Sequence, residues 1–352
     1  MAQQHLDPPT NPAARSSPRL PAPLAQGGTP TGDDLAAYLR AQATEFLRSL
    51  RQHRETGGAA NGSQESVDAV RALRRSARRI SGSLHTFRPL LEAEWSEGMR
   101  PELAWLSGAL AREHAYGARL ERLLGALNRL SGATLPTSGT PAAPKGNLTV
   151  GAAKAGALLD RQLTLARTRA HSAALQALGS SRFHAVADSV AVLASEVPLV
   201  PGAAGTDLRP SAAAAEDRLT DAVAALPLVT AGHPYNAEAL VHGLSADTVP
   251  QPQDAPWHQV RLLLRLHRYA REVLYGQECP VDVRLLAAGQ ALNRHRDAAE
   301  AASAAASAAR TPRIAPATAY ALGVLHADQR HEVEAARFAF QQAWQKEAVR
   351  TP

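Results

Sequence analysis

Apolar residues recur along most of the chain three or four positions apart, which is the spacing of residues on one face of an α-helix. Stretches rich in Pro, Gly and Ser interrupt this periodicity and separate the predicted helices. The sequence lacks the alternation of apolar and polar residues that is typical of strands. We therefore predict an all-α fold. The predicted helices cover about residues 33–54, 64–88, 100–130, 149–178, 181–196, 211–225, 235–245, 257–275, 280–309 and 316–348.

Two stretches without this periodicity indicate how the chain is organised. Residues 1–32 are rich in Pro, Gly, Ser and Gln, a composition that is typical of disorder. Residues 131–147 read SGATLPTSGTPAAPKGN, which is typical of a linker. We expect a disordered tail followed by an ordered region over 33–349. Its halves, about 33–130 and 148–349, look like two related helical bundles, each of which gives one basic helix to a shared interior.

The helix predicted over 64–88 carries a stripe of five arginines at positions i, i+3, i+4, i+7 and i+8. At 100° per residue they fall within an arc of about 140°, and the opposite arc is apolar. Carboxylates are few beside the stripe, so we expect five unpaired, mutually repelling guanidiniums. A solvated helix face usually mixes Arg with Glu or Asp four residues away, so this row favours an anionic partner with many charges in a line. The stripe consists of Arg71, Arg74, Arg75, Arg78 and Arg79.

A second basic stripe lies on the helix predicted over 257–275, within an arc of about 80° that an aromatic residue borders. Much of the remaining circumference is apolar, which predicts a largely buried helix. Unpaired charge is too costly to bury, and Glu272 is the single acid on this arc. We therefore expect the stripe to face a groove or channel that takes an anion. Its residues are His258, Arg261, Arg265, Arg268 and Tyr269.

Composition agrees with a phosphate-bearing anion. The chain has 352 residues, with 38 Lys and Arg against 32 Asp and Glu, and a sequence pI of about 9.9. Only three of the basic residues are lysines, and the guanidinium of arginine matches phosphate oxygens through two parallel hydrogen bonds. A biased genome composition also explains a high total of Ala, Gly, Pro and Arg, but it does not account for the two stripes.

Other features exclude several classes of protein. The single cysteine, Cys279, excludes an intrachain disulfide and a cysteine-based metal site, and it fits a reducing cytosol. The N-terminal residues lack the apolar segment of a secretory signal, and no stretch reaches the about 18 apolar residues of a membrane span. H-E-x-x-H and P-loop motifs are missing, and His326 and His331 are spaced for different helix faces. We expect a cytoplasmic protein with no metal, no cofactor and no membrane partner.

The two basic helices resemble those of the CHAD family, the conserved-histidine α-helical domain. VRALRRSARRISGSLHTFRPLL resembles the family's V-H-x-x-R-V-x-x-R-R-L-R-x-x-L-x-x-F pattern, with Arg71 in the place of the histidine. WHQVRLLLRLHRYARE resembles L-H-x-x-R-x-x-x-K-x-L-R-Y-x-x-E, with Arg265 in the place of the lysine. The matching residues are Arg74, Arg78, Arg79, Leu84 and Phe87 in the first helix, and His258, Arg261, Arg268, Tyr269 and Glu272 in the second.

Two further segments extend the resemblance to about residues 33–349. Residues 101–123 are similar to the segment that closes with R-D-x-D in the family, although that signature is lost here, and residues 289–301 keep Asp297. The resemblance implies a pseudo-symmetric fold of two helical bundles around a basic central channel that binds inorganic polyphosphate, and association with polyphosphate granules. Some members carry a triphosphatase-type domain with an E-x-E-x-K motif, which this sequence lacks.

Three alternatives stay open at this point. Nucleic acid is a rival polyanion, but single-strand binders interleave aromatic with basic residues, and only Tyr269 does so here. The stripes could instead dock an acidic protein on a helical scaffold. An enzyme that hydrolyses or transfers phosphate would need a nucleophile or metal site that the sequence does not display, so we interpret His258 as a ligand for phosphate. The two stripes thus predict non-catalytic binding of a linear polyanion, and the resemblance implies that this polyanion is inorganic polyphosphate.

Overall fold

The computed structural model describes residues 28–56, 63–132, 147–233, 243–244, 251–276 and 279–345. Within these ranges the chain is helical, and β-pairing is limited to two isolated bridges, between residues 31 and 207 and between residues 91 and 199. The predicted all-α fold is confirmed. The helices are α1 Gly32–Thr56, α2 Ser63–Thr86, α3 Ala93–Ala109, α4 Arg112–Leu130, α5 Asn147–Leu178, α6 Ser181–Ser195, α7 Arg209–Ala224, α8 Leu228–Ala231, α10 Ala255–Tyr275, α11 Val283–Ala309 and α12 Pro316–Gln345, with 3-10 turns at η1 Arg88–Leu90, η2 Ala203–Gly205 and η3 Pro252–Asp254.

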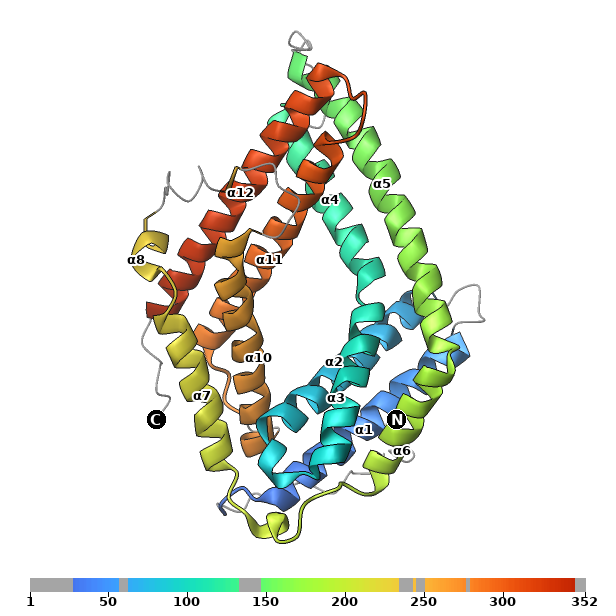
Figure 1. Ribbon diagram of the computed structural model, residues 1–352, viewed down its shortest axis with the longest axis vertical. Helices are drawn as coiled ribbons and strands as arrows, with labels where there is room; N and C mark the ends of the chain where they lie inside the picture. The colour runs from blue at the N-terminus through green and yellow to red at the C-terminus, as the bar shows by residue number, and fades with distance from the viewer. Residues whose placement is uncertain are drawn as a thin grey trace, which may run out of the picture.

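The helices lie along the four sides of a diamond-shaped frame (Figure 1). Helices α4 and α5 form its upper right side, and α11 and α12 form its upper left side. Helices α1, α2, α3 and α6 form the lower right side, and α7 and α10 form the lower left side. Contacts of α2 with α10, and of α4 and α5 with α11 and α12, close the frame between segments that are far apart in the sequence.

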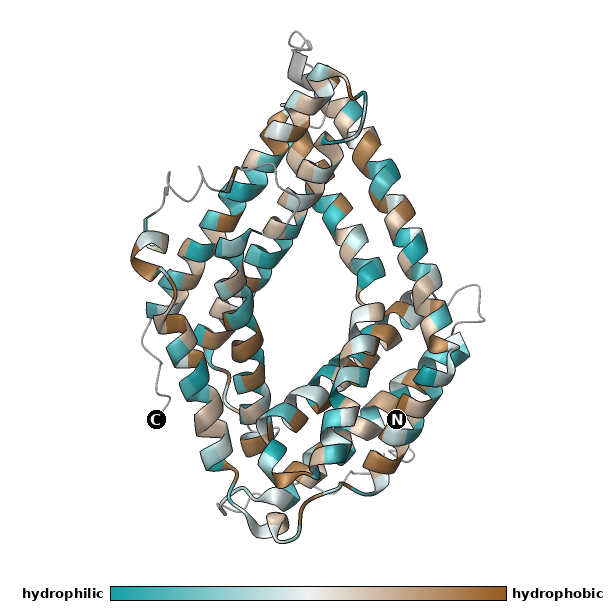
Figure 2. Ribbon diagram, viewed as in Figure 1, coloured by the Kyte–Doolittle hydropathy of each residue, from teal (hydrophilic) through white to brown (hydrophobic). Residues whose placement is uncertain are grey.

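Three apolar clusters hold this frame together. The first buries Phe46 of α1 and Ile80 of α2, together with side chains of α3 and α6. The second, between α4, α5, α11 and α12, contains only Leu and Ala among its fully buried members. The third gathers around Trp257 of α10 and Phe340 of α12. Figure 2 shows hydrophobic and hydrophilic positions exchanging turn by turn along the helices, as the sequence periodicity requires.

The first cluster does not follow the two halves that the linker suggested. It includes Val190 and Leu193 of α6 and Val273 of α10, all of which come after the linker. The core around α1 and α2 is therefore completed by residues from the second half of the sequence. The expectation that the halves are two related bundles stays a prediction.

The predicted helix over 100–130 is wrong as a single element. Helix α3 begins at Ala93 and ends at Ala109, and α4 starts at Arg112 after a turn at Leu110. No Gly or Pro occupies the turn itself. Tertiary packing explains the bend, because α3 packs in the first apolar cluster and α4 packs in the second. The tail 1–27, linker residues 133–146 and, except for residues 243–244, the predicted helix over 235–245 lie outside the described residues.

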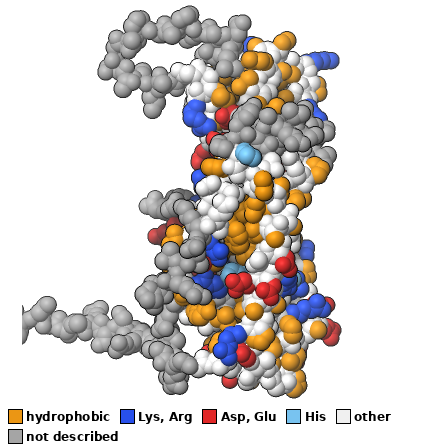
Figure 3. Space-filling view, turned by 90° about the vertical axis from the view of Figure 1, so that its left-hand side faces the viewer, with side chains coloured by type: hydrophobic (Ala, Val, Ile, Leu, Met, Phe, Trp, Pro, Cys, Tyr) orange, Lys and Arg blue, Asp and Glu red, His pale blue; other side chains and the backbone are white. Residues whose placement is uncertain are grey.

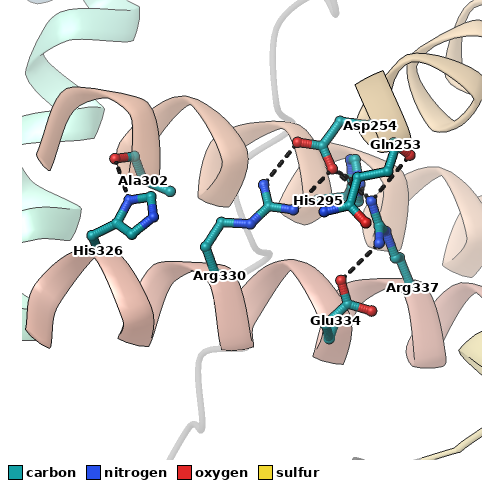
Figure 4. Close-up of polar contacts among 8 residues, drawn as sticks. All are labelled: Gln253, Asp254, His295, Ala302, His326, Arg330, Glu334 and Arg337. Carbon is teal, nitrogen blue, oxygen red and sulfur yellow. Dashed lines mark hydrogen bonds and ion pairs between the residues drawn. The ribbon is translucent and has the colours of Figure 1, made fainter. Parts of the chain in front are cut away.

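A buried polar network fixes the start of α10 against α11 and α12 (Figure 4). Asp254 precedes α10 and accepts hydrogen bonds from Arg330 Nη1 at 2.8 Å and from Arg337 Nη2 at 2.6 Å. Arg337 also donates to Glu334 at 2.7 Å and, through Nε, to His295 Nε2 at 3.3 Å. All five side chains are at least nine-tenths buried. Burial opposes the charged form of Asp254, yet its interactions with His295 and Arg330 lower its pKa below the usual range.

Candidate functional site

Helices α2 and α10 bring the two basic stripes together where they pack against each other. Gly82 of α2 allows this close approach, because a Cβ atom at that position would lie 2.5 Å from Cδ2 of Tyr269 on α10. Any larger residue would require the Tyr269 ring or the helices to shift. The absence of a side chain at position 82 therefore makes room for the Tyr269 ring where the two stripes meet.

Five guanidiniums from three helices form what we call the central arginine cluster. Burial lowers the pKa of Arg74 to about 10, and the charges of Arg78 and Arg296 contribute. Burial also lowers the pKa of Arg261 to about 10, with the charges of Arg296, Arg265 and Arg78 acting in the same direction. Such mutual effects show that these side chains lie close enough to repel one another. The cluster consists of Arg74 and Arg78 of α2, Arg261 and Arg265 of α10, and Arg296 of α11.

Neutral groups, rather than carboxylates, surround most of this cluster. Arg78 Nε donates to Ser107 Oγ at 3.0 Å, and Arg261 Nε donates to Asn293 Oδ1 at 2.8 Å. Nε of Arg74 is buried without a hydrogen-bond partner. Among the described residues, only Arg296 of the cluster forms an ion pair with a carboxylate. The charge of Asp297 offsets part of the repulsion on Arg261, but within the described part of the chain no carboxylate forms an ion pair with the other four arginines.

Arg296 was not among the predicted site residues. It pairs with its neighbour Asp297 and lies 3.9 Å from Glu300. Arg296 lies in the segment 289–301, in which the family resemblance indicated Asp297 but not its neighbour. The sequence alone does not show that Arg296 lies beside the two stripes, because this depends on the packing of α11 on α10.

Arg79 corrects the expectation that all five arginines of α2 are unpaired. Its Nε lies 2.6 Å from Glu272 Oε2, and its Nη2 lies 3.3 Å from Oε1, so the pair is bidentate. Tyr38 donates to the same carboxylate at 3.1 Å, and the guanidinium carbon lies 5.8 Å from the centre of the Tyr269 ring. Burial opposes the charge of Arg79, but the hydrogen bond and charge of Glu272 raise its pKa overall. Glu272 thus neutralises an arginine of the other helix.

The remaining predicted residues lie at the edges of the site. Arg71 is exposed and pairs with Asp68 at 3.2 Å, so the expectation of an unpaired guanidinium is wrong there too. Arg75 is exposed on α2. Arg268 is also exposed and lines a separate pocket of about 220 Å³ with Cys279. These three side chains lie outside the central arginine cluster.

His258 is placed between the cluster and the buried network. Its ring meets that of His295 edge to face, with 5.5 Å between the ring centres. Its Nε2 atom is buried without a hydrogen-bond partner. Burial lowers the pKa of His258, and the charges of Arg261 and Arg296 act in the same direction against the opposing charge of Asp254. The imidazole is therefore neutral at pH 7 in the absence of a bound anion.

The cluster contrasts with the outer surface of the molecule. Figure 3 shows basic and acidic side chains lying side by side on one outer face, as on an ordinary solvated surface. Within the described ranges, no group of three or more His, Cys, Asp or Glu side chains is arranged to hold a metal ion. None of the described helices contains an apolar stretch long enough to cross a bilayer.

Comparison with known proteins places these features in a family. The CHAD domain family matches residues 41–304. The solved structure of PptA from Streptomyces chartreusis is 73% identical in sequence, with a TM-score of 0.77, and the match covers 90% of this chain and 100% of PptA. A search among curated proteins found no match. The family match extends over well more than half of the chain, and the resemblance carried by the two basic helices is confirmed: the chain belongs to the CHAD domain family.

Proposed function

We propose that the protein binds inorganic polyphosphate, or a similar linear polyanion, through the central arginine cluster and does no chemistry on it. The observation that carries this proposal is the convergence of five guanidiniums, four of which have no carboxylate partner among the described residues. Assembling these like charges destabilises the unliganded protein, and an anion with several charges in a line relieves the repulsion. Polyphosphate binding is also what membership of the CHAD family implies.

Nucleic acid is the rival ligand, and the aromatic residues do not favour it. Single-strand binders stack bases on aromatic rings beside their basic residues. Tyr269 is the one aromatic residue of the stripes, and its ring packs against Gly82 and beside Arg79. One ring provides no row of stacking platforms for successive bases. A polyanion without bases fits the cluster better.

Measuring affinity across a salt series tests the proposal. Labelled polyphosphate and a single-stranded RNA with the same number of phosphates are titrated with the full chain between about 50 and 200 mM salt. We expect tighter binding of polyphosphate, and a steep linear fall of log affinity with log salt as bound counterions are released. A flat salt dependence contradicts binding through the cluster. RNA binding as tight as that of polyphosphate supports the nucleic-acid alternative.

The cellular counterpart of this proposal is association with polyphosphate granules in the cytoplasm. A fluorescent fusion of the full chain should co-localise with granules stained for polyphosphate. Replacing Arg74 and Arg261 together with glutamine should disperse the fusion, because both guanidiniums belong to the cluster. Unchanged localisation of that variant would contradict recruitment through this site.

A further inference from the structure

A groove of about 390 Å³ opens between α2, α3 and α10, beside the central arginine cluster. This volume falls within the range of about 300–1,000 Å³ that is usual for small-molecule sites. Its basic lining residues are Arg78, Arg265, Arg100 and His85, and no Asp or Glu lines it. A groove with three guanidiniums and no carboxylate is suited to an anionic ligand.

Two polar pairs mark the ends of the groove. At one end Arg78 Nε donates to Ser107 Oγ at 3.0 Å, and at the other Arg100 Nη2 lies 2.9 Å from His85 Nδ1. Arg78 and His85 are seven residues apart, which corresponds to about 10 Å along α2. Burial lowers the pKa of His85, and the nearby charges of Arg100, Arg218 and Arg88 lower it further. Neutral His85 accepts the hydrogen bond from Arg100.

The wall between these ends is apolar. Its exposed side chains are Ala104 of α3 and Leu262 of α10, and Leu103 and Leu266 are buried behind them. Leu262 is 38% exposed, so its side chain presents apolar surface to the groove. An inorganic phosphate chain has no apolar surface, so it would leave this wall in contact with water. A ligand with an apolar body would remove the wall from water and gain the corresponding free energy.

We propose that this groove binds a nucleoside phosphate. Its phosphates contact Arg78 and Arg265, and its base and sugar lie along the wall of Leu262 and Ala104 toward the pair of His85 and Arg100. Arg78 and Arg265 also belong to the central arginine cluster. The nucleoside phosphate and polyphosphate therefore compete for the same two guanidiniums. Binding at the groove itself goes beyond the proposed function and does not depend on it.

Comparing ADP with pyrophosphate tests the proposal, because both carry a diphosphate and only ADP has an apolar body. Each ligand is titrated calorimetrically into the full chain without polyphosphate. We expect ADP to bind at least about tenfold more tightly, which is the contribution expected from burying part of an apolar wall. Equal affinities, or tighter binding of pyrophosphate, would overturn the proposal and leave an inorganic anion site only.

Two variants locate the apolar body. Leu262→Asn should weaken ADP binding about fivefold or more while pyrophosphate binding stays constant, because only the contact with the wall is lost. Ala104→Leu fills the groove from an exposed position of α3 with a good helix former, and it should have the same selective effect. Leu165→Asn on α5, where the leucine is 49% exposed, is the matched control and should change neither affinity. If neither groove variant weakens ADP binding selectively, the nucleoside does not lie on this wall.

Competition separates this inference from the proposed function. Adding polyphosphate should raise the apparent dissociation constant of ADP linearly with the concentration of free polyphosphate. If ADP binds and polyphosphate does not bind at all, the proposed function fails while the groove assignment stands. If polyphosphate saturates the protein and ADP affinity stays unchanged, the placement of the phosphates on Arg78 and Arg265 is overturned.

Discussion

Replacing Glu272 with glutamine should make the protein less stable and, at the same time, a stronger binder of polyphosphate. Glu272 holds Arg79 through two contacts, at 2.6 and 3.3 Å, and accepts a hydrogen bond from Tyr38. Glutamine keeps the size of the side chain and one acceptor oxygen, but it removes the negative charge. The substitution leaves Arg79 charged and without its ion pair.

The effect on stability follows from the burial of the pair. The side chain of Glu272 is 22% exposed and that of Arg79 is 30% exposed, so solvent screens the pair only in part. Leaving one partner of a charge-assisted hydrogen bond unpaired costs about 1–3 kcal/mol. In a domain somewhat smaller than this chain, each 1 kcal/mol lowers Tm by about 2–4 °C. Thermal unfolding monitored by circular dichroism should therefore show a drop of several degrees.

The effect on binding comes from the charge that Arg79 regains. Glu272 lies on the same stripe of α10 as Arg261 and Arg265, so its removal makes the site more positive. If Arg79 then contacts one further phosphate, the slope of log affinity against log salt should steepen by about 0.7–0.9, the value per phosphate in nucleic acids. Affinity for polyphosphate at low salt should rise accordingly. The assay is the salt series described above, run on the variant and the unmodified chain in parallel.

A second bidentate pair provides the control. Arg182 Nε and Nη2 lie 2.6 and 3.0 Å from the two oxygens of Glu102, on α6 and α3. Glu102→Gln removes the same charge from the same geometry without touching α2 or α10, so its salt slope should stay unchanged. An unchanged or shallower slope for Glu272→Gln would refute the reasoning and make Arg79 a structural residue alone.

Four further outcomes are expected. Arg261→Gln should weaken polyphosphate binding by about 1–3 kcal/mol without loss of stability in the unliganded protein, whereas Arg75→Gln, at an exposed position, should change affinity much less; unfolding of Arg261→Gln would contradict a binding role. Asp254→Ala should lower the free energy of unfolding by about 3–5 kcal/mol in denaturant titrations, since it leaves the buried Arg330 without its carboxylate partner and takes one of two carboxylates from Arg337. Burial lowers the pKa of His295 to about 4, so as pH falls from 6.5 to 4 this histidine takes up a proton in the unfolded chain before it does so in the folded one. The free energy of unfolding should therefore decrease over that window, by at most about 1.4 kcal/mol per pH unit. His295→Asn should make this decrease smaller. Incubation with polyphosphate and Mg²⁺ should release no phosphate, and turnover that disappears in His258→Ala would overturn the non-catalytic proposal.

Local patterns in the sequence were enough to predict what each basic helix looks like by itself. The periodicity of α2 and α10 placed Arg74, Arg78, Arg261 and Arg265 on polar faces, and the structure brings these four together. The prediction failed where a residue depends on another helix. Arg79 belongs to the same stripe as Arg78 by spacing, yet its partner lies 193 positions away on α10. No pattern within one helix carries that information.

The same limit explains the errors in the fold. The bend at Leu110 separates two helices that pack in different apolar clusters, and no Gly or Pro at the bend predicts it. Arg296 joined the site only because α11 packs on α10. The sequence likewise predicts surface positions for charged residues of the buried network, such as Asp254 and Arg337, because their partners come from distant segments. Pairings between distant segments are the part of the structure that sequence periodicity does not encode.

The closure of the helical frame has a consequence for the order of events during synthesis. Arg74 emerges from the ribosome long before Arg261, and Val273 of α10 completes the apolar cluster that holds α1 and α2. A nascent chain that stops before α10 carries one basic stripe and an unfinished core, so it has neither the cluster nor the support that aligns it. Joining the ends of so long a loop adds little entropy cost beyond that of a short loop, because the cost grows only with the logarithm of length. Polyanion binding should therefore switch on late and in one step, and a polyanion already present in the cell would favour the last step of folding by screening the charges that α2 and α10 bring together.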